Sequence, residues 1–204
     1  MEKIFKVDDD NLNEFKFIFT DGSKYKNMAG CAVFQENLKI KLGYKFPDFV
    51  SVFTTELIAI KKALELIKRY NFQKAIIFTD NKSCIAKLQN LFYTTKLLDA
   101  EYYVIWNNIA RLVEGGHNVK LLWVKAHSGI VGNELAKRAS EHGPEVKVAM
   151  YKDFLNKVSQ RINMEWQKDW DVSSQTRGQY YKRIKPVVNK KLWQEQFKEE
   201  DRRV

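Results

Sequence analysis

Residues 75–79 have the sequence AIIFT, and this run is the best guide to the fold. It is short and apolar, which is typical of a strand buried on both faces of a parallel sheet. Before it, apolar residues recur at three- and four-residue spacing from Leu57 to Ile67. That spacing predicts a helix over about residues 54–71. A helix followed by a buried strand favours an α/β domain.

Three strands are expected before this helix. Residues 16–20 (KFIFT) form an apolar run that meets a turn signal at Asp21-Gly22-Ser23. Residues 30–35 and 38–45 then form a hairpin that turns near residues 36–37. The chain therefore begins with three antiparallel strands.

The pattern after residue 79 alternates again. Helical spacing predicts helices over residues 81–91 and 100–113, and residues 119–124 form another apolar strand. A loop over residues 125–132 leads into a short helix over residues 133–142. The order β-β-β-α-β-α-α-β-α predicts a mixed five-stranded sheet with helices on both faces.

Charge divides the chain of 204 residues into a domain over residues 1–146 and a basic extension over residues 147–204. The net charge is +10, and the extension carries 14 Lys and Arg against 8 Asp and Glu, so six of those charges belong to it. An anionic partner is plausible. Apolar residues from Tyr151 to Trp170 predict one long amphipathic helix, and residues 178–204 are expected to be irregular.

The composition also bounds the environment. There are two cysteines, Cys31 and Cys84, with no CxxC pair, so a reducing compartment is expected. No apolar run reaches the length of a membrane span, and the N-terminus lacks an apolar signal core. These features predict a soluble intracellular protein, cytoplasmic or nuclear, without a membrane partner.

Three acids stand where open α/β sheets place chemistry. Asp21 and Asp80 each follow an apolar strand, and Glu56 lies in the first turn expected of the first helix. If the two strands are parallel neighbours, the carboxylates meet at one edge of the sheet. Crowded carboxylates are stabilised by a divalent cation, and oxygen ligands favour Mg²⁺ or Mn²⁺ over Zn²⁺. Each acid alone could instead be a turn residue or a helix cap, as Asp80 before Asn81 suggests.

A histidine adds to this pattern. His127 lies in the run WVKAHSGIVGNE at residues 123–134, between the last strand and the last helix. A histidine on a glycine-containing loop can move a proton or help to release product. A lone histidine is more often structural, so this assignment depends on its context.

Together these residues resemble the ribonuclease H type 1 family. The carriers are TDGS at residues 20–23, TEL at 55–57, TDN at 79–81 and the run at 123–134, in the family's order and across residues 14–142. The resemblance implies an RNase H-like fold and two ions, Mg²⁺ or Mn²⁺, held by Asp21, Glu56 and Asp80. It also implies hydrolysis of the RNA strand of RNA–DNA hybrids by a two-metal mechanism, with His127 aiding turnover.

The extension resembles a more particular group. Residues 165–170 (EWQKDW), 177–178 (RG) and 184–186 (IKP) are similar to the segment that follows this domain in polyproteins of non-LTR retrotransposons, as is the phrase FTTEL at residues 53–57. This implies a role in reverse transcription and a reverse transcriptase domain as a partner.

The sequence departs from the family at one acidic position. The family carries a fourth acid three residues after the Glu of Gly-Asn-Glu, where this chain has Lys137. A cation there would repel the second metal ion. Glu134 or Glu141 could supply the missing oxygen, a small deletion could shift the helix, or catalysis could be weakened or lost.

Substrate-reading positions differ as well. Val52-Phe53 stand where many members carry an Asn pair, and the family's basic protrusion is missing around residues 92–99. The nucleic-acid contacts are expected from Ser23, Asn27, Lys82, Ser83 and Asn133. Backbone electrostatics would then supply more of the affinity, which makes binding salt-dependent.

Three functions remain open at this point. The first is the hybrid-specific endonuclease, and the second is an inactive nucleic-acid-binding module derived from it. The third, an integrase or transposase on a similar sheet, needs only three acids. The run at residues 123–134 disfavours the third function because it matches the hydrolase.

Overall fold

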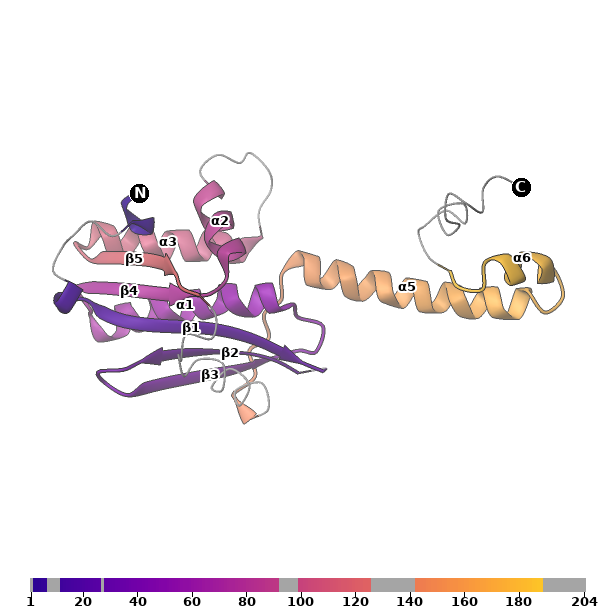
Figure 1. Cartoon of the computed structure of the whole chain (residues 1–204), viewed down its shortest axis with the longest axis horizontal. Helices are drawn as coiled ribbons and strands as arrows, with labels where there is room; N and C mark the ends of the chain where they lie inside the picture. The colour runs from indigo at the N-terminus through magenta and orange to yellow at the C-terminus, as the bar shows by residue number, and fades with distance from the viewer. Residues whose placement is uncertain (1, 7–11, 27, 92–98, 126–141, 189–204) are drawn as a thin grey trace. The chain divides into compact units, whose positions relative to one another are not determined.

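The computed structural model describes residues 2–6, 12–26, 28–91, 99–125 and 142–188. The chain forms two compact units, Met1–Asp153 and Phe154–Val204. The first unit runs past residue 146, where the change in composition places a boundary. Figure 1 shows the elements of each unit.

The first unit is built on a five-stranded mixed sheet. Its strands are β1 (Lys16–Tyr25), β2 (Met28–Gln35), β3 (Ile40–Phe46), β4 (Lys74–Thr79) and β5 (Asn118–Trp123), in the order β3-β2-β1-β4-β5. β1, β2 and β3 pair antiparallel, whereas β4 runs parallel to both β1 and β5. The predicted sheet is confirmed, including the parallel pairing of the first and fourth strands.

The end of β1 differs from the prediction. Asp21-Gly22-Ser23 was expected to form a turn, but the strand continues to Tyr25. Asp21 pairs with Ala32 and Gly22 pairs with Cys31 across the β1–β2 ladder. The ladder extends the strand because it satisfies the backbone groups that a turn would leave free.

Three α-helices lie between the strands in the described part of this unit: α1 (Val52–Tyr70), α2 (Lys82–Asn90) and α3 (Ala100–Glu114). α1 begins at the N-cap Ser51 and ends at Asn71, which adopts a left-handed conformation with φ 53°. Because α1 starts two residues earlier than predicted, Glu56 lies in its second turn rather than its first.

The main core lies between the sheet and these helices. Figure 1 shows α1 and α3 running behind β4 and β5. Ile18 of β1, Ile77 of β4 and Leu121 of β5 pack in one cluster with Leu64 of α1 and Ile105 of α3. The predicted helix over residues 133–142 and the loop before it fall almost wholly outside the described residues.

Two short 3-10 helices, Glu2–Phe5 and Leu12–Glu14, precede the sheet and were not predicted. Two α-helices follow it: α5 (Tyr151–Ser173) and α6 (Gln179–Ile184). α5 confirms the predicted long helix. α6 corrects the expectation of irregular chain from residue 178, while residues 189–204 lie outside the described part.

α6 and the chain after it fold back on the end of α5. Trp170 Nε1 donates to Lys185 O at 3.2 Å, and Gln167 Nε2 donates to Pro186 O at 3.1 Å. Lys182 and Asp171 form an ion pair at 3.1 Å. Across the part of the chain that is described, none of the helices combines the length and apolar character that crossing a bilayer requires.

Candidate metal centre

Three carboxylates from three elements meet in the first unit. Asp21 of β1, Glu56 of α1 and Asp80, directly after β4, each offer an oxygen, and these oxygens all lie within 4.8 Å of one another. Asp21 and Glu56 are buried, and Asp80 is half-buried. The structure therefore brings together the three acids that the sequence predicts as metal ligands.

The sheet topology explains the meeting of the two aspartates. The parallel ladder between β1 and β4 ends at the pair Phe19 and Phe78. Asp21 and Asp80 each lie two residues beyond this last pair, at the same edge. Thr20 Oγ1 donates to Phe78 O at 2.9 Å and links the two strands at that edge.

A close approach of backbone to backbone brings in the glutamate. Gly22 lies against the start of α1, where an added Cβ would stand 2.6 Å from Thr55 Oγ1 and 2.7 Å from Glu56 N. A side chain at position 22 would force the strand and the helix apart. The glycine after Asp21 thus lets α1 come near enough for Glu56 to join the aspartates.

Asp80 is not the helix cap that it could have been. The N-cap of α2 is Asn81, whose side chain accepts from Cys84 N at 3.1 Å. The carboxylate of Asp80 is therefore not used to begin α2. Its backbone is fixed from the other side, because Trp123 Nε1 donates to Asp80 O at 2.9 Å.

Burial and the like charge of neighbouring acids both raise the pKa values of Asp21 and Glu56. Burial, with the neighbouring Asp80 as the second cause, raises the pKa of Asp21 from 3.8 to about 7. Burial, followed by Asp21 and Asp80, raises the pKa of Glu56 from 4.5 to about 9. Without a cation the cluster holds its protons unusually tightly.

The donor set fits a hard divalent cation. Glu56 Oε2 is buried and has no hydrogen-bond partner, an arrangement that is costly unless another group completes it. Oxygen donors from three carboxylates suit Mg²⁺ or Mn²⁺, and a cation would offset the repulsion among them. Asp21, Glu56 and Asp80 are the residues that would hold it.

A cation–π pair borders the cluster. Lys82 Nζ lies 3.9 Å from the centre of the Trp123 ring. Trp123 was not among the predicted site residues. Lys82 and Ser83 are exposed in the first turn of α2, next to Asp80. Ser23 differs from them, because its Oγ is buried without a hydrogen-bond partner.

The remaining predicted site residues lie outside the described part of the chain. They are Asn27, His127, Asn133, Glu134 and Glu141. Lys137, which was predicted to stand at the position of the family's fourth acid, lies outside it too.

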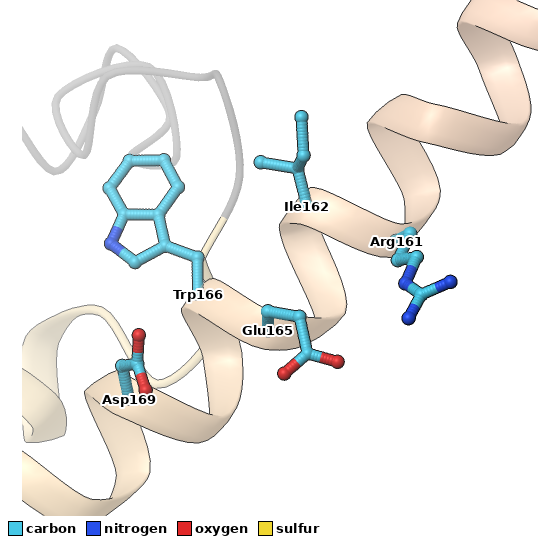
Figure 2. Close-up of a pocket in the computed structure, with 5 residues that line it drawn as sticks. All are labelled: Arg161, Ile162, Glu165, Trp166 and Asp169. Atoms are coloured by element: carbon cyan, nitrogen blue, oxygen red, sulfur yellow. The ribbon is translucent and has the colours of Figure 1, made fainter.

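The second unit has an open pocket on the surface of α5. Figure 2 shows Arg161, Ile162, Glu165, Trp166 and Asp169 around it, all from α5. The Trp166 side chain is 54% exposed. Its two acids, Glu165 and Asp169, do not belong to the metal-type group found in the described residues, which consists of Asp21, Glu56 and Asp80.

The part of the chain that contains these residues is similar to known proteins. A model of the RNase H family matches residues 13–145. Human ribonuclease H1 is 26% identical over 149 residues, which are 65% of this chain and 51% of the human protein. The chain thus spans about half the length of this curated relative.

Two solved structures are also similar. LC11-RNase H1, crystallised in complex with RNA/DNA hybrid, is 15% identical with a TM-score of 0.48, covering 61% of this chain and 96% of that one. RNase H1 from the halophilic archaeon Halobacterium salinarum NRC-1 is 15% identical with a TM-score of 0.47, covering 62% and 97%. The family model itself extends over more than half of the chain and includes all three clustered acids, so the chain belongs to the RNase H family.

Proposed function

We propose that this protein is a divalent-metal-dependent endonuclease that hydrolyses the RNA strand of RNA–DNA hybrids. The observation that carries the proposal is the cluster of Asp21, Glu56 and Asp80, whose oxygens lie within 4.8 Å of one another. Membership of the RNase H family supports the same reaction class.

The three acids have one shared task in this proposal. They would hold two ions, Mg²⁺ or Mn²⁺, which when bound activate water and stabilise the leaving oxygen of a phosphodiester. Asp21 and Glu56 bind as carboxylates, so each must release the proton that its raised pKa favours. His127, by its likeness to the family's loop histidine, would help turnover.

Exposed groups beside the cluster support a nucleic-acid backbone as the substrate. Lys82 offers an ammonium and Ser83 a hydroxyl in the first turn of α2, directly after Asp80. The whole chain carries a net charge of +10. Phosphate contacts of this kind make binding fall steeply with salt.

The protein is further proposed to act in the reverse transcription of a retroelement. It rests on the likeness of residues 165–170, 177–178 and 184–186 to the segment that follows this domain in non-LTR retrotransposon polyproteins. A reverse transcriptase domain would then be the partner that makes the hybrid. The activity would belong in the cytoplasm or the nucleus, where such elements are copied.

The direct test is cleavage of a labelled RNA–DNA hybrid with Mg²⁺ and with Mn²⁺. Wild type should cut the RNA strand, and Asp80→Asn should not, while duplex DNA joined to the same label should show no strand transfer. Cutting that survives Asp80→Asn would overturn the role of the cluster. Strand transfer would favour an integrase instead.

A second function is favoured by one residue. Lys137 stands where the family carries its fourth acid, so the chain could be a nucleic-acid-binding module with weakened or lost catalysis. Hybrid binding without cleavage, followed by cleavage in Lys137→Asp, would establish that reading. Cleavage by wild type would show that the fourth acid is replaced or dispensable.

A further inference from the structure

The segment from residue 144 to residue 153 runs past the end of the family match and is anchored to the rest of the first unit at several points. Lys45 N donates to Pro144 O at 2.9 Å, and Val146 N donates to Lys45 O at 2.7 Å, so the segment runs along β3. Met150 is buried in the main core. Tyr151 N donates to Asp99 Oδ1 at 2.7 Å, at the N-cap of α3. We call residues 146–153 the clasp.

The clasp ends on a buried carboxylate. Asp153 is 1% exposed, although it belongs to α5, whose other side chains are half-buried or exposed. Its Oδ1 accepts from Ser51 N at 3.1 Å, and its Oδ2 accepts from Thr54 Oγ1 at 2.7 Å and from Met150 N at 3.1 Å. Two of these three donors, Ser51 and Thr54, lie about a hundred positions earlier in the chain, so Asp153 links the start of α5 to the start of α1. Burying a carboxylate costs free energy unless such hydrogen bonds compensate it.

Asp153 supplies what the sequence of α1 lacks. In a capping box, the third helical residue is Glu or Gln and accepts the backbone N–H of the N-cap residue. Here the N-cap is Ser51 and the third helical residue is Thr54, which accepts nothing from Ser51 N. Asp153 accepts that N–H instead, from 102 positions further along the chain. The carboxylate also stands at the positive end of the α1 dipole.

The first turn of α1 leads straight to the metal cluster. Thr54 is bonded to Asp153, Thr55 packs against Gly22, and Glu56 follows with its buried Oε2. Thr54 and Thr55 are both buried. A small rotation of this turn would move the Glu56 carboxylate away from Asp21 and Asp80.

We propose that Asp153 is a positioning residue for the metal centre, which it serves by fixing the N-terminus of α1 and with it Glu56. The inference rests on the proposed function, since it assumes that the cluster binds metal. It assigns to residues beyond the family match a share in building the site. Residues that orient metal ligands typically change metal affinity about 10–100-fold when they are replaced.

The test uses the full chain and measures Mn²⁺ affinity by calorimetric titration, well below the unfolding temperature of every variant. Asp153→Asn should weaken Mn²⁺ binding about tenfold or more, because its amide NH₂ would face N–H donors whichever way it turns. Asp169→Asn is the matched control, since Asp169 is exposed on the same helix. It should bind Mn²⁺ as wild type does.

Thr54 gives a second route if Asp153→Asn does not fold. Thr54→Val keeps the shape but removes the hydroxyl donor to Asp153, and should weaken Mn²⁺ binding. Thr54→Ser keeps the donor and should restore it. The pair separates a lost hydrogen bond from a lost side chain.

The outcomes distinguish this inference from the proposed function. A wild-type protein that binds no Mn²⁺ overturns both. A wild type that binds Mn²⁺, with Thr54→Val and Asp153→Asn binding equally well despite lower unfolding temperatures, overturns this inference alone and leaves Asp153 with a structural role.

Discussion

Two regions of the molecule depart from ordinary packing in opposite ways. One is the junction where β1, α1 and β4 meet, and the other is the long helix α5. The junction buries acids: Asp21 is 6% exposed and Glu56 is 3% exposed. α5 leaves large apolar side chains in solvent, among them Ile162 at 58% and Trp166 at 54%. Stability alone would favour neither arrangement. Buried carboxyl groups indicate a ligand that completes the site, whereas an exposed apolar helix contributes little to the stability of the fold.

The largest effect should come from Gly22→Ala. The added Cβ would lie within 3 Å of Thr55 Oγ1, Glu56 N and Glu56 Cγ, so β1 and α1 must separate. We expect a loss of about 3 kcal/mol in the free energy of unfolding, at the upper end for atoms forced into a packed site, with loss of metal binding. Denaturant unfolding followed by circular dichroism measures the first quantity.

Gly115→Ala is the control for that change. Its added Cβ would come no closer than 3.2 Å to another atom, the carbonyl oxygen of Arg111. It should cost less than about 1 kcal/mol. Equal losses in the two variants would show that the strand and the helix do not need their close approach.

The next effect is the pH dependence of the free energy of unfolding when no metal is bound. The pKa of Asp21 rises from 3.8 to about 7 and that of Glu56 from 4.5 to about 9, mainly through burial. The unfolded chain therefore releases these protons at lower pH than the folded protein does. Stability without metal should fall as the pH rises from about 4 to about 9.

Asp21→Asn tests this directly. In EDTA it should raise the free energy of unfolding by about 1–3 kcal/mol at pH 8, because it removes a buried like charge. The gain should shrink at pH 5, where Asp21 keeps its proton in the folded protein. Thermal unfolding at the two pH values measures it, and a gain that is larger at pH 5 would contradict the sign.

A smaller effect should distinguish two exposed tryptophans. Trp123→Phe removes the hydrogen bond to Asp80 O, which should cost about 1 kcal/mol and lower the rate of hybrid cleavage several-fold. Trp166→Phe, in the α5 pocket, should change neither quantity. If both variants keep the stability and the cleavage rate of wild type, Trp123 does not help to hold Asp80 in place.

The smallest effect should follow from Val158→Lys in α5. Val158 is 52% exposed, so a lysine meets solvent rather than core. We expect a change of less than about 0.5 kcal/mol in the free energy of unfolding. A loss as large as that of Gly22→Ala would mean that this face of α5 is packed in solution.

The sequence predicted the sheet and its three acids because both depend on local patterns. Apolar runs identify strands, and parallel neighbours align their carboxyl ends, so Asp21 and Asp80 could be placed together. The end of β1 was not predictable in this way. Asp-Gly is a strong turn signal, and only the pairing of Asp21 with Ala32 overrides it.

The remaining features depend on contacts between distant residues. Asp153 carries no local signal that it accepts the Ser51 N–H, and Trp123 carries none that it fixes Asp80. The raised pKa of Glu56 follows from burial that only the folded chain defines. Such features need the assembled structure because their partners are set by tertiary packing rather than by spacing.

Asp21, Glu56 and Asp80 are proposed to form a divalent metal site, and calorimetric titration with Mn²⁺ shows whether they do. Wild type at pH 8 should bind Mn²⁺, release protons on binding and bind more weakly at pH 6, while Asp21→Asn should lose most of the affinity. If wild type binds no Mn²⁺, or if Asp21→Asn binds it equally well, these three acids do not form the metal site.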